Sequence, residues 1–174
     1  MMNIIILAVA ILIVGFVIYV ATRPSLFTHS ESAVIKASPD KIFPYISQLK
    51  LGGNWSPYEK RDLNMKKTFS GNDGAPGSKL VFDGKKEVGA GSVEILSVVP
   101  NQEVKLRLLM SRPMKADNLI TYQIEPVGPD TRFTWSMQGE NGFFGKLFVT
   151  LVDCRKMLRK DMNEGFQNLR QIVE

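Results

Sequence analysis

The chain has 174 residues, of which 44% are hydrophobic and 22% are charged, and its formal net charge is +5 at pH 7. All 39 charged side chains (22 basic and 17 acidic) follow Thr22, and about a quarter of the remaining residues are charged, as in ordinary globular domains. This composition excludes a disordered chain, a collagen, a coiled coil and a transporter with several membrane spans, and the charged part is long enough for one domain with a hydrophobic core.

The N-terminal segment predicts an apolar helix. Residues 4–21 are an unbroken run of apolar or small residues, with Tyr19 near its end, and Arg23 and Pro24 follow it. About 20 helical residues span the ~30 Å hydrocarbon layer of a bilayer. A cleaved signal peptide is the alternative, but no Lys or Arg precedes the run, and the run exceeds the usual ~7–15-residue apolar region. We therefore predict a retained single-pass transmembrane anchor over residues 1–22.

The orientation of this anchor depends on few charges. Arg23, Lys36 and Lys41 follow the helix, whereas the terminal amine is the positive group that precedes it. The positive-inside bias therefore favours a globular domain on the cytoplasmic side. We expect a linker over residues 23–29 and the domain over residues 30–174.

Seven segments of the domain predict strands, because apolar and polar residues alternate in them or turn residues bound them. They are residues 32–37, 65–69, 78–82, 91–98, 103–110, 118–125 and 131–137. The connections between the last six are short and rich in Gly, Pro, Asn and Asp, which indicates hairpin turns. Successive strands should therefore pair in an antiparallel meander.

Two segments predict helices. Ser38, Pro39 and Asp40 form an N-terminal helix signal that opens a short helix ending near Leu49. Apolar residues recur at spacings of three and four over residues 144–173, which predicts one long amphipathic helix. The expected fold is α+β, with a seven-stranded curved antiparallel sheet wrapped around this long C-terminal helix and preceded by one transmembrane helix. The space between sheet and helix is either filled by side chains or left as a cavity.

The order of these elements and several local strings resemble the SRPBCC superfamily. Its helix-grip fold is shared by START lipid-transfer domains, Bet v 1-like pollen allergens and the polyketide cyclase/dehydrase group. The strings are residues 37–43, 55–60, 65–71, 88–91 and 131–135, and the resemblance covers about residues 30–174. It is to bacterial members in particular, which implies anchoring in a bacterial inner membrane. It also implies a hydrophobic cavity for lipids, sterols, polyketides or quinones, although a shared fold does not transfer chemistry.

Eight residues are candidates for contact with a hydrophobic ligand, because they are aromatic, adaptable or polar at the expected cavity. They are Trp55, Tyr58, Glu59, Phe82, Met110, Tyr122, Trp135 and Met162. For the apolar members the alternative is a packed core. Glu59 is the candidate polar group at the cavity mouth, and its alternative is a surface carboxylate paired with Lys60 or Arg61.

No convincing catalytic constellation is present in the sequence. His29 is the single histidine and falls in the expected linker, and Cys154 is the single cysteine and falls in the expected long helix. Gly89, Ala90 and Gly91 lack the further glycine of a dinucleotide fingerprint. We therefore predict no catalytic residue, metal site or cofactor.

Five basic pairs account for much of the positive charge, including Arg155-Lys156 and Arg159-Lys160. Nucleic-acid binding is not favoured, because no recognition motif is present. A surface held near anionic lipid and a plain solvated surface are the remaining interpretations.

The predicted function is membrane-tethered binding of a hydrophobic small molecule, such as a lipid, an isoprenoid or a polyketide-like compound. A cyclase or dehydratase that uses Tyr58, Glu59 or Asp83, a protein-interaction module with a filled core, and a role in stress or envelope maintenance stay open as alternatives. The sequence leaves the oligomeric state open.

Overall fold

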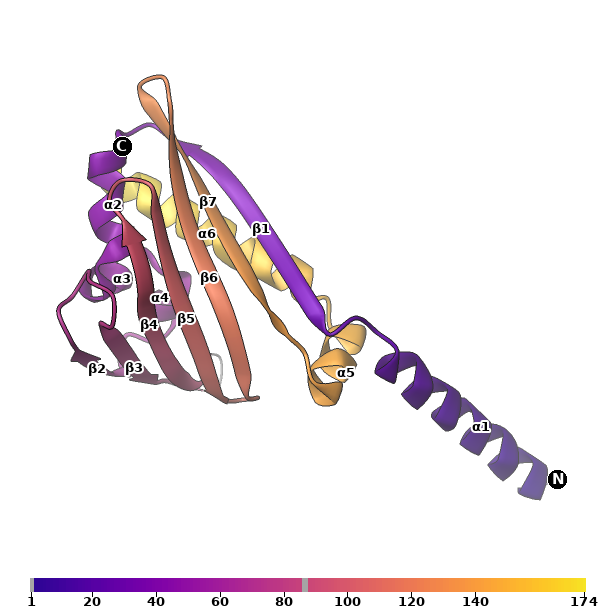
Figure 1. Ribbon diagram of the computed structural model, residues 1–174. Coiled ribbons are helices and arrows are strands. Elements are labelled where there is room, and N and C mark those ends of the chain that lie inside the picture. The colour runs from indigo at the N-terminus through magenta and orange to yellow at the C-terminus, as the bar shows by residue number, and fades with distance from the viewer. Residues whose placement is uncertain (1, 86–87) are drawn as a thin grey trace.

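The computed structural model describes residues 2–85 and 88–174. It begins with helix α1 (Met2–Ala21), strand β1 (Leu26–Ile35), helix α2 (Pro39–Ser47), the 3-10 helix η1 (Leu49–Leu51) and helices α3 (Gly52–Trp55) and α4 (Pro57–Arg61). Strands β2 (Lys66–Ser70), β3 (Lys79–Asp83), β4 (Ala90–Val99), β5 (Glu103–Arg112), β6 (Ala116–Val127) and β7 (Asp130–Glu140) follow. Helices α5 (Phe143–Leu151) and α6 (Cys154–Val173) complete the described chain (Figure 1).

The strands form one antiparallel seven-stranded sheet in the order β1-β7-β6-β5-β4-β3-β2. The last six strands are a meander, as the turn-rich connections predict, and β1 pairs with β7 at the edge of the sheet. The sheet curves around the helices that follow β1 and around α6 (Figure 1). The predicted α+β class and the seven-stranded antiparallel curved sheet are confirmed.

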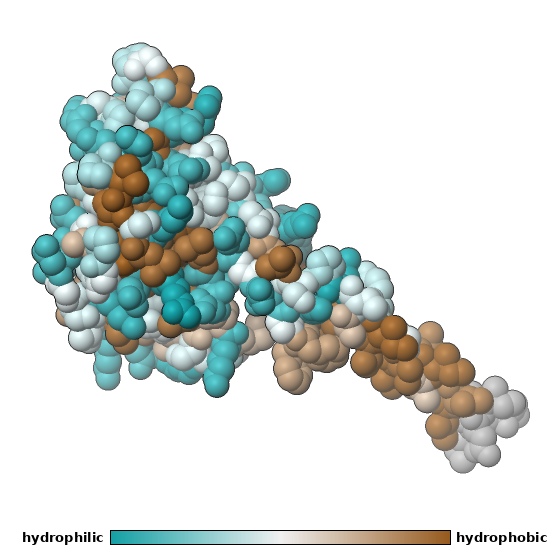
Figure 2. Space-filling view, in the orientation of Figure 1, coloured by the Kyte–Doolittle hydropathy of each residue, from teal (hydrophilic) through white to brown (hydrophobic). Residues whose placement is uncertain are grey.

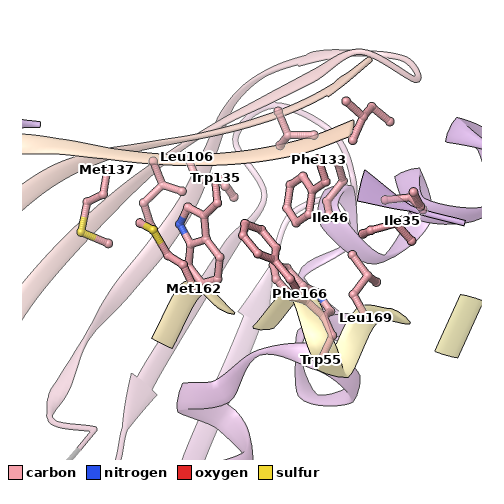
Figure 3. Close-up of a cluster of buried hydrophobic side chains, with 14 of the residues drawn as sticks. Ile35, Ile46, Trp55, Leu106, Phe133, Trp135, Met137, Met162, Phe166 and Leu169 are labelled. Atoms are coloured by element: carbon pink, nitrogen blue, oxygen red, sulfur yellow. The ribbon is translucent and has the colours of Figure 1, made fainter. Parts of the chain in front are cut away.

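The concave face of the sheet carries the main hydrophobic core. Phe133 and Trp135 of β7 are buried there, as the alternation of apolar residues predicts. Their side chains point toward Met162, Phe166 and Leu169 of α6, so the sheet and this helix are joined by packed side chains (Figure 3).

The C-terminal helix differs from its prediction, because the expected single helix over 144–173 is two helices. Val152 has extended backbone angles (φ −123°, ψ 133°), which ends α5. The Asp153 carboxylate then accepts a hydrogen bond from the backbone N–H of Lys156 at 3.0 Å and caps α6. An Asp at an N-cap is favoured because it satisfies a free N–H of the first turn. The core helix is therefore α6 alone.

The N-terminal segment forms a helix over nearly the predicted residues. Strand β1 begins at Leu26, inside the predicted linker over 23–29, and His29 pairs with Met137 in the sheet instead of lying in a linker. Strand β1 starts earlier than predicted because β7 extends to Glu140 and so provides a pairing partner for each residue of β1 back to Leu26. The predicted transmembrane role of α1 is not supported, because no helix in the described part of the chain is both long and apolar enough to cross a membrane.

Candidate ligand-binding cavity

A cavity of about 340 Å³ lies between the β3–β7 part of the sheet and the segment from α2 to α4. Its walls are mostly apolar, and the lining residues include Leu49, Leu80, Val93, Leu106, Leu108, Ile120 and Met137. Helix α6 contributes Leu158 to this lining. The cavity was expected between the sheet and the long C-terminal helix. It lies instead mostly between the sheet and the short helices, because core side chains fill the interface between the sheet and α6.

Seven of the eight predicted ligand residues line the cavity, namely Trp55, Tyr58, Glu59, Phe82, Met110, Tyr122 and Trp135. The eighth, Met162, does not line it and is fully buried in the core between α6 and the sheet. A packed core and a cavity lining were the two alternatives for the aromatic residues. Trp55 and Trp135 do both, because they belong to the core and also line the cavity.

Three aromatic side chains form a rigid wall of the cavity. The ring centroids of Trp55, Tyr122 and Trp135 are 5.4 to 5.6 Å apart, and every pair meets edge to face. This geometry is the one that aromatic rings prefer. The indole N–H of Trp55 donates to the backbone carbonyl of Tyr45 at 2.7 Å, which fixes its orientation. The buried indole nitrogen of Trp135 has no hydrogen-bond partner among the described residues.

Two tyrosines, Tyr58 and Tyr122, line the cavity. Burial raises the pKa of Tyr58, and the nearby Asp161 carboxylate raises it further. Burial also raises the pKa of Tyr122, with a smaller contribution from the charge of Glu59. Both phenols therefore stay neutral at physiological pH. The Tyr58 hydroxyl is hydrogen-bonded to Asp161, whereas the Tyr122 hydroxyl can donate a hydrogen bond to a ligand.

Glu59 is the one charged residue among the described residues that line the cavity, and its partner is not one of the two expected from the sequence. Its Oε2 atom accepts a hydrogen bond from Nζ of Lys67 at 2.7 Å, and its side chain is 10% exposed. Arg61 instead pairs with Asp161. A Cβ atom on Gly52 would overlap the Glu59 carboxylate, so the glycine makes room for this side chain.

The sequence did not single out the lining residues of α2 and the following turn. Tyr45, Gln48 and Leu49 reach the cavity from this segment, whose short helices carry little periodicity. Leu106 and Leu108 of β5 also line the cavity. Their alternation with charged residues could have identified them as inward-facing residues from the sequence.

Other candidate groups lie outside the cavity. The imidazole of His29 is 3.1 Å from the Glu31 carboxylate, which belongs to the same strand. Burial raises the pKa of the Cys154 thiol, followed by the charge of Asp153, so the reactive thiolate is disfavoured. Asp83 pairs with Arg112 at the surface. No group of three or more metal-ligating side chains occurs within the described residues.

Residues 27–174 match the model of a family described as "Polyketide cyclase / dehydrase and lipid transport". The chain belongs to this family. No curated protein matches the chain by sequence. The match confirms the resemblance to the SRPBCC superfamily, and it begins one residue after the start of β1.

Solved structures show that this member of the polyketide cyclase/dehydrase and lipid transport family shares its fold with proteins of low sequence identity. Protein CV1439 from Chromobacterium violaceum is 13% identical with a TM-score of 0.62, over 84% of this chain and 96% of that one. Aha1 from Colwellia psychrerythraea, solved as a dimer, is 18% identical with a TM-score of 0.61, over 85% and 96%. Major latex-like protein 151 from Panax ginseng is 13% identical with a TM-score of 0.58, over 84% and 96%. These likenesses establish the Bet v 1-like fold.

Proposed function

We propose that the protein binds a hydrophobic small molecule, such as a lipid, an isoprenoid or a polyketide-like compound, in the cavity beneath the sheet. The observation that carries the proposal is the cavity itself, because its volume of about 340 Å³, lined mostly by apolar and aromatic side chains, falls within the usual range of small-molecule sites, about 300–1,000 Å³. A protein-interaction module with a filled core is less well supported, since this part of the interior is not filled.

The polar groups of the cavity suggest the form of the ligand. Neutral Tyr122 can donate to a carbonyl, ether or hydroxyl oxygen. A polar head group of the ligand could also interact with the Glu59–Lys67 ion pair. An apolar body with an oxygen-bearing end satisfies both features.

Binding is favoured over cyclase or dehydratase chemistry. Tyr58 and Glu59 both reach the cavity, but Asp83 does not line it. A general acid works best with a pKa near the operating pH. The raised pKa of Tyr58 does not give it this property, and the Glu59 carboxylate is already held in an ion pair with Lys67.

We also propose that α1 inserts into a lipid bilayer. The helix has 20 residues, and the side chains of residues 5–19 are exposed, with Leu12 at 72% and Ile5 at 63% exposed. Transfer of this apolar surface from water to lipid is favourable by about 25 cal/mol per Å². Figure 2 shows α1 as a hydrophobic rod that projects from a largely hydrophilic domain.

Strand pairing supports a cavity near the proposed bilayer. Leu26, Glu140, Ala116 and Met110 lie at one end of the sheet, and α1 joins the domain at this end. Met110 and Pro113 line the cavity and belong to the same end. A ligand that partitions into lipid would then enter a cavity a short distance from the membrane.

The ligand proposal is tested with the full chain purified from native membranes, from which bound small molecules are extracted and identified by mass spectrometry. Leu108→Trp fills the cavity and should abolish retention of the compound. Leu109→Trp is the matched control, because Leu109 is the next residue on β5 and does not line the cavity. If neither a bound compound nor stabilisation by fatty acids, sterols or quinones is found, the proposal is wrong.

The membrane proposal has its own test. Full-length protein should stay with membranes after alkaline extraction, and Leu12→Arg combined with Val9→Arg should release it. If α1 crosses the bilayer as the sequence predicts, the charges that follow it favour a cytoplasmic domain. A C-terminal reporter that is active in one compartment alone decides the side.

A further inference from the structure

Helix α5 is an apolar helix that the domain does not bury. None of its nine residues, Phe143–Leu151, is buried, and Lys146 is its single charged residue. Phe144 is 76% exposed and Leu151 is 69% exposed. The sequence predicts that these residues face the sheet, whereas the break at Val152 turns the helix away from it. A cluster of exposed Phe and Leu side chains on a small domain indicates a surface that another phase or molecule covers.

This helix lies beside the point where α1 meets the domain (Figure 1). Nζ of Lys146 donates to the backbone carbonyl of Ala21 at 3.1 Å, so a cation sits at the C-terminus of α1, where the helix dipole favours one. Val20 of α1 is fully buried, although its neighbours along the helix are exposed. The hydrophobic surface of α1 therefore continues into that of α5, as Figure 2 shows.

The start of α6 carries positive charge next to this surface. Arg155 and Lys156 are exposed in the first turn of α6, where the helix dipole favours acidic residues instead. Neither has an ion-pair partner among the described residues. Basic side chains beside an apolar helix are the arrangement that binds the head groups of anionic lipids.

We propose that α5 is a second membrane-contacting element, which lies in the bilayer interface next to α1 with Phe144, Phe148 and Leu151 among the lipid chains. The inference rests on the proposed insertion of α1, and it adds a defined orientation. With two contacts instead of one, the domain is held against the membrane by the end of the sheet that carries Met110 and Pro113.

The test uses the full chain in vesicles of phosphatidylcholine and phosphatidylglycerol that contain nitroxide-labelled lipid. Cys154→Ser removes the single cysteine, and a fluorophore is attached through Phe148→Cys, Val127→Cys or Leu12→Cys in this background. Phe148 and Val127 are matched, since they are 40% and 39% exposed, and Val127 lies at the opposite end of the sheet. Leu12 reports on α1.

We expect strong quenching at positions 12 and 148 and none at 127, with weaker quenching at 148 when phosphatidylglycerol is omitted. Quenching at 12 without quenching at 148 overturns the inference and leaves the anchor standing. No quenching at 12 defeats the membrane proposal itself. Quenching at 148 by nitroxide-labelled copies of the protein instead of labelled lipid shows that a second copy covers α5, which also overturns the inference. Thermal unfolding of each variant checks the fold, and Phe144→Cys provides a second reporter on α5.

Discussion

Nζ of Lys67 lies 2.7 Å from Oε2 of Glu59, and this ion pair joins strand β2 to helix α4 beside the cavity. The two side chains are unequally solvated, with Glu59 10% exposed and Lys67 33% exposed. Removal of the lysine therefore leaves a carboxylate with little access to water, which is costlier than loss of a fully exposed pair.

We expect Lys67→Met to lower the free energy of unfolding by about 1–3 kcal/mol, between the values for exposed and buried pairs. Adding Glu59→Gln should restore part of the loss, because the unpaired charge is then gone. Urea unfolding of both single variants and the double variant measures the coupling. Strictly additive losses would show that the two groups do not interact.

Gly52 and Gly53 allow a sharper test of the position of Glu59. A Cβ atom on Gly52 would overlap the Glu59 carboxylate, whereas a Cβ atom on Gly53 would be 3.4 Å from Oε2, within ordinary contact. Gly52→Ala should displace the carboxylate and weaken ligand retention, and Gly53→Ala should leave it nearly unchanged. Mass spectrometry of the purified variants compares the two, and equal retention would contradict this account.

The buried tyrosines predict how stability changes at alkaline pH. The pKa of Tyr122 is raised in the folded state by burial and by Glu59, so the unfolded state loses this proton first. Stability from this group is therefore complete below its ordinary pKa of about 10 and declines as the pH rises above it. Tyr122→Phe should flatten the decline, and should not change the tyrosinate absorbance of the folded protein below pH 12. An unchanged pH dependence of unfolding would argue against a buried phenol.

Local patterns were sufficient to predict the sheet and most of one cavity wall. Alternation along β5, β6 and β7 decides which side chains face inward, and Met110, Tyr122 and Trp135 follow from it. Phe82 follows in the same way from β3, where it is buried beside exposed Val81. Such residues are predictable because the side-chain period of a strand is set by its own backbone.

The other wall and the end of the chain depend on contacts that no local pattern contains. Met162 belongs to the apolar stripe of α6, but such a stripe does not indicate which part of the sheet the helix covers. In the structure α6 lies against β1 and the short helices. The spacing of three and four also continues through Val152, so periodicity hides the break. Asp153 was the available signal, since it is an N-cap residue inside an otherwise helical pattern.

Gly165 determines how closely α6 approaches the aromatic wall. A Cβ atom at this position would be 2.9 Å from Cζ3 of Trp135 and 3.4 Å from Cζ3 of Trp55. Because the two indoles are held by edge-to-face contacts, they have little freedom to move away.

Alanine normally stabilises a helix by about 0.8–1 kcal/mol relative to glycine, whereas overpacking a core costs about 1–3 kcal/mol. We expect the second effect to prevail, so that Gly165→Ala lowers the free energy of unfolding by about 1–2 kcal/mol. The control is Gln167→Ala, an exposed substitution on the same helix that should change stability by less than about 0.5 kcal/mol. Urea unfolding compares the two, and a Gly165→Ala variant more stable than the parent would show that α6 can shift outward at no cost.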